Sequence, residues 1–217
     1  MEYPEEHSYL AVDNYSRLPS KVSSVVSTIS SLSNVIKKNA NSTAAIKHYL
    51  NNHGHIPLWV LVNFLTFGEI NHFYSNLVDN LQIKIATEFS RERSREWSSE
   101  NKIRITPETI KTVNHLVNLF RNSVAHGEIT YSRKIAKSPK TTPIRIALNM
   151  DKSVFSSQAG VFELILSLKV MLPKKYYIKL SHELINLLSQ YKNKFQSIDF
   201  SSILQDMNFP NNYQEYI

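Results

Sequence analysis

One predicted helix constrains the fold of this chain more than any other feature. Thr106, Pro107 and Glu108 together are typical of a helix start, with a hydroxyl cap, a first-turn proline and an acid that complements the helix dipole. Gly127 is suited to ending the same helix in a left-handed conformation. Between these ends, apolar residues recur at spacings of three and four, at Ile110, Val113, Val117, Phe120 and Val124. The pattern predicts an amphipathic helix from about Thr106 to His126 with one buried face.

The last turns of this helix carry Arg121, Asn122 and His126 in the stretch Arg-Asn-Ser-Val-Ala-His-Gly. Asn122 and His126 are four residues apart, so they share a face that points away from the apolar stripe. Arg121 lies about 140° round an ideal helix from His126, near the edge of the stripe. One helix therefore does not force the two side chains together. Two such helices packed side by side would bring two copies of each residue into one cleft.

Arginine and histidine without metal ligands suit the cleavage of RNA phosphodiesters. Histidine moves a proton near neutral pH, and arginine holds a phosphate and stabilises the charge that develops on it. The RNA 2′-hydroxyl can then act as the nucleophile and leave a 2′,3′-cyclic phosphate. A structural alternative stays open, in which His126 interacts with the helix dipole and Arg121 lies along the core edge.

A second stretch comes earlier, where Ile56-Pro57-Leu58-Trp59 is followed by Phe67-Gly68, Tyr74 and Leu77. In this order and spacing, the two stretches resemble the abortive-infection (Abi) proteins of bacteria, which belong to the HEPN superfamily. The superfamily motif is an arginine, a polar residue and then a histidine four to six residues after the arginine. The resemblance covers roughly residues 42–135, and Ser132 departs from the asparagine that the family tends to carry there.

The resemblance implies an all-helical, usually dimeric protein that cleaves or binds RNA in phage defence or as a toxin. The first functional hypothesis is a metal-independent endoribonuclease whose catalytic residues are Arg121, Asn122 and His126. The alternative is a non-catalytic protein that forms a complex with a small structured RNA. An antitoxin or a small RNA is the partner that either hypothesis allows. A helical protein-interaction module is a third possibility, but it leaves the charge of the chain unexplained.

The charge favours a polyanionic partner, because the formal net charge is +7. Residues 129–149 contain cations and no acid, directly after the motif. We predict that this basic loop binds RNA through its backbone, with Tyr131 beside it. The residues predicted to bind RNA are Tyr131, Arg133, Lys134, Lys137, Lys140 and Arg145. Pro139 and Pro143 favour a loop here, with a short strand at Ile144–Leu148.

The fold class predicted for the whole chain is all-α, because apolar periodicity recurs and only four glycines occur in 217 residues. We expect a HEPN-like helical bundle with additional N- and C-terminal helices. Its parts are an arm over residues 1–19, docked through tyrosines such as Tyr9 and Tyr15, and one domain over residues 20–217. Further helices are expected from Ser20, over Ser42–Gly54, over Leu58–Phe67 in the central core with Trp59, from Glu69, over Leu81–Phe89, Gly160–Leu172 and Tyr176–Phe195, and near Phe200–Met207.

Several classes of site are excluded or disfavoured by composition. The chain has no cysteine, which removes disulfides, thiolate metal sites and cysteine nucleophiles. His48, His53 and His55 lie close in sequence, but the turn at Gly54 and Pro57 separates them, so no metal site and no cofactor are predicted. No run of 18 apolar residues and no signal peptide are visible, so we expect a cytoplasmic protein with no membrane segment.

Overall fold

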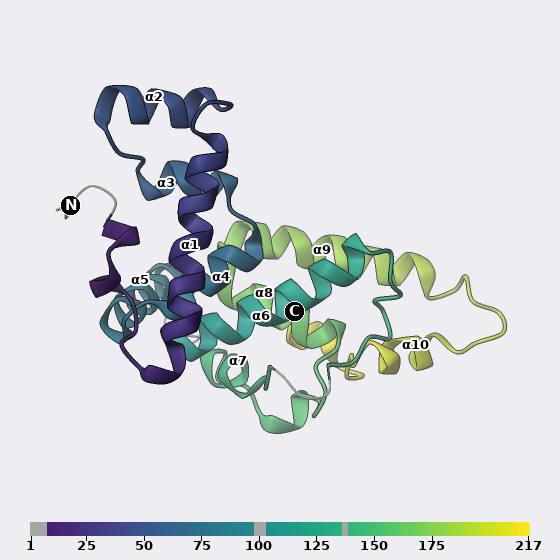
Figure 1. Ribbon diagram of the computed structural model, residues 1–217. Coiled ribbons are helices and arrows are strands. Elements are labelled where there is room, and N and C mark those ends of the chain that lie inside the picture. Colours follow the sequence, from purple (N-terminus) through teal and green to yellow (C-terminus); the bar gives the residue numbers. More distant parts are fainter. Residues whose placement is uncertain (1–7, 98–102, 136–138) are drawn as a thin grey trace. The chain divides into compact units, whose positions relative to one another are not determined.

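The computed structural model describes residues 8–97, 103–135 and 139–217 (Figure 1). The regular structure of these residues is helical, and β pairing among them is limited to two isolated bridges, Tyr15–Leu77 and Ile135–Ala159. The predicted all-α fold is therefore confirmed. No helix in this part of the chain combines the length and the apolar character that a membrane crossing requires.

The chain divides into two compact units, Met1–Lys84 and Ile85–Ile217, and the boundary falls within helix α5. The first unit contains η1 (Ser8–Leu10), η2 (Val12–Asn14), η3 (Pro19–Lys21), α1 (Val22–Asn39), α2 (Ala44–His53), α3 (Leu58–Leu61), η4 (Val62–Phe64), α4 (Phe67–Asn76) and the start of α5 (Asp79–Glu96). The second contains the rest of α5, then α6 (Pro107–Ala125), α7 (Thr142–Ala147), η6 (Lys152–Val154), α8 (Val161–Met171), α9 (Lys174–Tyr191), α10 (Phe200–Asp206) and η7 (Tyr213–Glu215). The division into an arm and a single domain over residues 20–217 stays a prediction.

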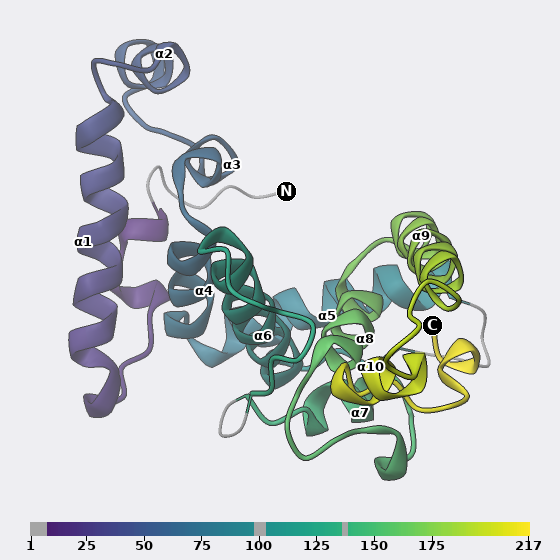
Figure 2. The ribbon, with the colours of Figure 1, turned by 90° about the vertical axis from the view of Figure 1, so that its right-hand side faces the viewer.

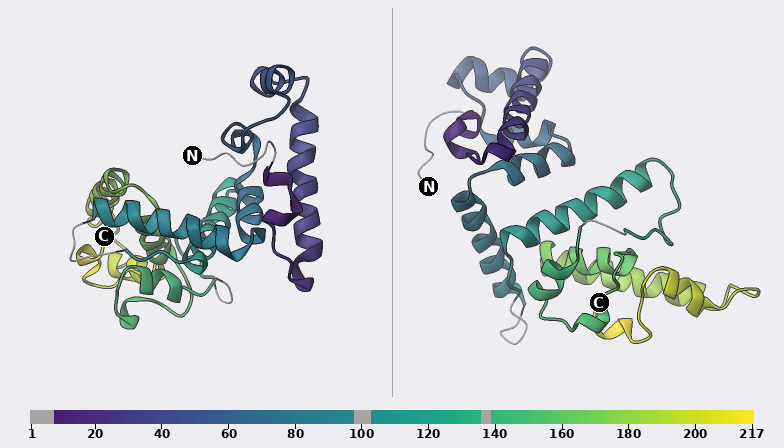
Figure 3. Two further views of the ribbon diagram at one scale, coloured as in Figure 1. Left: turned by 90° about the vertical axis from the view of Figure 1, so that its left-hand side faces the viewer. Right: turned by 60° about the horizontal axis from the view of Figure 1, so that its bottom comes forward.

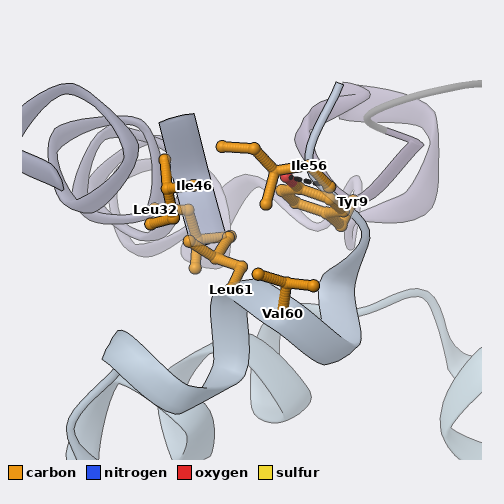
Figure 4. Close-up of a cluster of buried hydrophobic side chains, with 6 residues drawn as sticks. All are labelled: Tyr9, Leu32, Ile46, Ile56, Val60 and Leu61. Atoms are coloured by element: carbon orange, nitrogen blue, oxygen red, sulfur yellow. Dashed lines mark hydrogen bonds between the residues drawn. The ribbon is translucent and has the colours of Figure 1, made fainter. Parts of the chain in front are cut away.

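The first unit is built on α1, which runs alongside α4 and also contacts α2 (Figure 2). Its apolar core gathers side chains from η1, α1, α2 and α3 and from the segment before α3 (Figure 4). These core residues are Tyr9, Leu32, Ile46, Ile56, Val60 and Leu61. The Tyr9 hydroxyl donates to the Ile56 carbonyl at 2.8 Å, and burial raises the pKa of Tyr9 to about 12. Together with the fully buried Tyr15, this docks the N-terminal segment on the unit, as predicted.

The start of α1 differs from the prediction. The helix begins at Val22 after a 3-10 turn, and Lys21 stands at the cap without a side-chain capping hydrogen bond, so the helix does not begin at Ser20. Val26 is 61% exposed, whereas Thr28 is buried and accepts a hydrogen bond from the Asn76 side chain at 2.8 Å. This buried polar contact with the end of α4 turns α1 so that Val26 faces outward.

The predicted helix over Leu58–Phe67 is wrong in its length. The α-helix α3 ends at Leu61, a 3-10 turn follows, and α4 begins at Phe67 behind Thr66. The reason is local, because Thr66 and Glu69 form a capping box that starts a new helix. Trp59 is 60% exposed and does not belong to the core, although its neighbour Val60 does.

In the second unit, α6 lies against α8 and α7, and α8 also contacts α9 (Figure 3). The apolar helices α8, α9 and α10 were predicted close to their observed bounds. The segment predicted as a strand at Ile144–Leu148 is instead part of the helix α7, because Ile144 and Ala147 are both buried at helical spacing.

The helix α5 extends beyond the predicted end at Phe89 to Glu96, and one of the arginines in this extension is buried. Arg93 is 4% exposed and pairs with the Glu96 carboxylate at 2.9 Å. The same carboxylate accepts from the Lys174 backbone N–H at 2.8 Å, at the start of α9. Arg93 therefore has a structural role in joining α5 to α9.

We predict that Leu32→Ala destabilises the protein by about 2–5 kcal/mol, because it leaves a cavity in a fully packed site. Val26→Ala on the same helix is the matched control and should change the free energy of unfolding by about 0.5 kcal/mol or less. Urea unfolding followed by circular dichroism measures both. Equal losses for the two variants would contradict the orientation of α1 described above.

Candidate functional site

The motif helix α6 begins and ends where the sequence predicts. The Thr106 hydroxyl accepts a hydrogen bond from the Thr109 backbone N–H at 3.2 Å, and Pro107 occupies the first turn. The buried face consists of Thr109, Ile110, Thr112, Val113, Leu116, Phe120 and Ser123. Val124 was predicted to continue this face but is 65% exposed. Ser123 replaces it because it follows Leu116 by seven residues, two helical turns, whereas Val124 is rotated a further 100° or so.

The C-terminal end of α6 is a Schellman motif. Gly127 donates its N–H to the Val124 carbonyl at 3.1 Å, and Glu128 donates to the Ser123 carbonyl at 2.9 Å. Gly127 has a φ of 69°, in the left-handed region, as predicted. His126 is the last residue before this turn, and its N–H donates to the Asn122 carbonyl at 3.0 Å. The histidine backbone is therefore fixed on both sides by hydrogen bonds.

Arg121, Asn122 and His126 are all exposed at this end of α6. Among the described residues, no hydrogen bond or ion pair engages any of the three side chains. The structure thus leaves a guanidinium, an amide and an imidazole available to a ligand on the last two turns of one helix. It does not join Arg121 to His126 within the chain, which agrees with their angular separation on the helix.

Large apolar side chains stand exposed around the same helix end. Val124 is 65% exposed, Ile129 is 73% exposed and Tyr131 is 48% exposed. Exposed apolar groups that are close together and rimmed by polar residues often mark an interaction surface. No signal in the sequence indicated that Val124 is exposed, because its spacing matches the buried stripe.

The cationic side chains of the basic loop differ in whether they form hydrogen bonds or ion pairs within the protein. Arg133 pairs with Glu128, an acid immediately before the loop that the sequence prediction did not take into account. The Lys134 ammonium donates to the Asn208 side chain and to the Gln205 carbonyl. These bonds hold part of the loop to the last turn of α10 and to Asn208 just after it.

The other cations of the loop lie further along the chain. Lys140 is exposed, and Lys137 lies outside the described residues. One Arg145 N–H donates to the Met150 carbonyl at 3.1 Å. The positive charge of Arg145 also helps to lower the pKa of Asp151, behind the larger contribution of two hydrogen bonds from Ser153. Lys140 is thus the predicted contact whose charge is most open to solvent within the described part of the loop.

Metal-binding potential is low in the described part of the chain, where no group of three or more His, Asp or Glu side chains could hold an ion. His48, His53 and His55 do lie near one another, but as rings in edge contact. The candidate site at the end of α6 therefore offers general acid–base and phosphate-binding groups from the chain itself.

A family model described as Abi-like protein matches residues 1–132. The chain belongs to the Abi-like protein family. The match extends over α1 to α6 and includes Arg121, Asn122 and His126, which supports an abortive-infection context. Neither a curated protein nor a solved structure matches the chain. The helices α7 to α10 of this Abi-like protein follow the matched segment.

We predict that Gly127→Ala costs about 1 kcal/mol of stability, because it forces a residue with a Cβ into the left-handed region. The space around Gly127 is open, so the cost is conformational and not steric. Gly127→Asn should cost less, since asparagine tolerates this conformation. Gly68→Ala is the control, because Gly68 has no positive φ and a Cβ there would make only ordinary contact. Thermal unfolding compares the three variants, and equal effects at positions 127 and 68 would contradict the prediction.

Proposed function

We propose that this Abi-like protein is a metal-independent endoribonuclease of an abortive-infection or toxin–antitoxin system, with a HEPN-type site. The observation that carries the proposal is the exposed and unengaged group of Arg121, Asn122 and His126 at the fixed end of α6. A side chain that serves the fold is normally buried or bonded, whereas these three are held only by their backbone. The family match to residues 1–132 supports the defence context.

The reaction is an intramolecular transesterification. The RNA 2′-oxygen attacks the adjacent phosphorus and loses its proton to an imidazole acting as general base. The bond from phosphorus to the 5′-oxygen breaks, and that oxygen receives a proton from a general acid. The products are a 2′,3′-cyclic phosphate and a 5′-hydroxyl end, with no change of oxidation state. His126 carries the proton in this scheme, and Arg121 holds the non-bridging phosphate oxygens with its planar fork. Asn122 orients the phosphate or the imidazole.

A homodimer completes this site. Arg121 and His126 point about 140° apart on one helix, so one chain does not readily place both on one phosphate. A two-fold pair of α6 ends brings both arginines and both histidines into one cleft, where Arg121 of one copy acts with His126 of the other. The exposed apolar side chains of Val124 and Ile129 provide surface for such a pairing beside the motif.

The surrounding charge attracts RNA without reading its sequence. The net charge of +7 draws a polyanion towards the protein, and the exposed Lys140 lies on the loop that follows the motif. Arg133, Lys134, Lys137, Arg145 and Tyr131 complete the proposed RNA contact. Arg133 binds a phosphate by releasing its present partner, Glu128. This exchange is feasible because an ion pair with an exposed carboxylate is weak.

A non-catalytic RNA-binding protein is the second candidate function. It is favoured by the absence of any hydrogen bond between Arg121 and His126 in the described residues. In that case the same side chains contact phosphates, and the protein holds a small structured RNA in the same defence context.

We predict that His126→Ala lowers the rate of RNA cleavage by roughly a hundredfold to ten-thousandfold, the range for loss of a general acid or base. The fold should be unaffected, because the side chain is exposed. Arg121→Lys should be almost as damaging, since a lysine lacks the bidentate fork. The assay follows labelled RNA in EDTA and identifies the cyclic-phosphate ends.

The matched control is His182→Ala, which removes an exposed histidine from α9 and should leave cleavage unchanged. Cleavage by His126→Ala at the wild-type rate, or a requirement for a divalent ion, contradicts the mechanism. Retained RNA binding in a protein that never cleaves supports the second candidate instead.

The composite site leads to a separate prediction, tested by mixing two inactive variants. If each site takes Arg121 from one copy and His126 from the other, a dimer of Arg121→Ala with His126→Ala contains one intact site. Random exchange should then restore about a quarter of wild-type activity, since half of the dimers are mixed and each has one of two sites. A mixture that stays inactive, although exchange is shown by differently tagged copies, rules out a site shared in this way.

A further inference from the structure

Five side-chain rings of the first unit form one connected cluster, in which each ring contacts at least one other. The cluster is distant in sequence from the motif. Tyr49 is at their centre, with ring centroids 5.5 Å from His48, 5.4 Å from His53 and 5.7 Å from Trp59. His53 in turn lies 5.6 Å from His48 and 6.2 Å from His55. We call His48, Tyr49, His53, His55 and Trp59 the ring cluster. It joins α2 to α3 across the turn at Gly54.

Three rings of the cluster are exposed, and Tyr49 and His55 are half-buried. Trp59 is 60% exposed, and His48 and His53 are exposed as well. Burial normally removes so large an apolar ring from water, and an exposed tryptophan often marks a binding site. The contact between Tyr49 and Trp59 is perpendicular, at 89°, so the two rings do not cover each other face to face.

The backbone beneath the cluster is held firmly by the core of the first unit. Ile46 anchors α2, and both Ile56 and Val60 anchor the segment that carries Trp59 (Figure 4). Each buried residue lies one to three positions from a ring of the cluster, so packing fixes the backbone that presents the rings. A rigid aromatic surface binds with a smaller loss of conformational entropy than a mobile one.

All the charged residues in the sequence segment that contains the cluster are positive. Residues 14–68 contain no aspartate and no glutamate, and they contain Arg17, Lys21, Lys37, Lys38 and Lys47. Lys37 and Lys38 are exposed at the end of α1, and Lys47 is exposed on α2 beside the cluster. The surface therefore combines π-faces with cations, as surfaces that bind single-stranded nucleic acids do.

We propose that the ring cluster is a stacking platform for unpaired bases of single-stranded RNA, with Lys37, Lys38 and Lys47 near the phosphates. A metal ion is a poorer occupant, because the histidines meet edge to face and no three form a binding group in the described residues. This proposal rests on the proposed function in one respect, namely that the partner is RNA. It does not require that the protein cleaves RNA. Its role is to hold an RNA through its bases, whatever happens at Arg121 and His126.

The test uses the fluorescence of Trp59 in full-length protein that carries Trp97→Phe and His126→Ala. Trp59 is then the only tryptophan, and the RNA survives the titration if His126 is catalytic. A single-stranded RNA oligonucleotide should quench the emission, because a base stacks on the indole. An abasic oligonucleotide of equal length, with phosphates but no bases, should quench far less. Equal quenching by both, or none by either, would overturn the proposal.

Binding measurements give a second readout. Trp59→Ala should weaken binding of the RNA oligonucleotide by roughly fivefold to a hundredfold, the range for one lost stacking contact. Trp59→Phe keeps an aromatic face and should lose less, which also guards against a folding defect in the alanine variant. Leu58→Ala is the matched control, since Leu58 is exposed on the same helix but lies outside the cluster.

Two outcomes separate this proposal from the proposed function. If Trp59→Ala weakens RNA binding while no variant cleaves RNA, the platform stands and the nuclease proposal fails. If Trp59→Ala binds RNA like Leu58→Ala while wild-type protein cleaves it, the platform fails and the nuclease proposal stands. In the second case the ring cluster serves another partner, such as a protein.

Discussion

The burial of one face of α6 is the constraint on which the candidate site depends. Leu116 and Phe120 are held against the neighbouring helices of the second unit, so the opposite side of α6 must face outward. The Schellman turn then fixes where the helix ends. Within the described part of the chain no side-chain bond holds Arg121 or His126, so these two features position them. A site made in this way has a rigid backbone and free functional groups, which is what a phosphate ligand needs.

The same construction explains why one chain does not bring Arg121 and His126 together. A helix presents residues five apart on different sides, and no packing in the second unit changes that angle. Glu128, the acid that follows the motif in the sequence, is paired with Arg133. Within the described residues, the arginine of the motif forms no ion pair, while the arginine of the loop forms one. That distribution favours phosphate at the motif over phosphate at Arg133.

Sequence alone predicted the elements whose signals are local. The cap at Thr106, the stop at Gly127 and the helical periodicity between them act within a few residues, so α6 was placed correctly. The errors arose where a tertiary contact decided between equal local choices. Val124 fitted the apolar stripe as well as Ser123 did, and only the neighbouring helices determine which is buried.

Trp59 shows the same limit. The mostly apolar stretch Leu58–Phe67 predicts a buried helix, but the capping box at Thr66 divides the stretch and the core accepts only part of it. Hydrophobicity could not show which apolar residues would find a place in the core. For the candidate site, the sequence identified Arg121, Asn122 and His126, whose exposure the structure then showed. It did not reveal the ring cluster, because contacts between rings on α2 and α3 depend on the turn between them.

The two proposed RNA contacts differ in the physical basis of recognition. At the end of α6, the ligand is a phosphate, and charge and proton transfer decide the outcome. At the ring cluster, the ligand is a base, and the exposed π-face of Trp59 decides it. Phosphate contacts alone would attract any polyanion, including duplex nucleic acid, because they do not distinguish paired from unpaired strands. Stacking on Trp59 requires a base that is free of its partner. In this proposal, the ring cluster therefore supplies a preference for unpaired RNA that arginine, lysine and histidine at the motif cannot supply by charge.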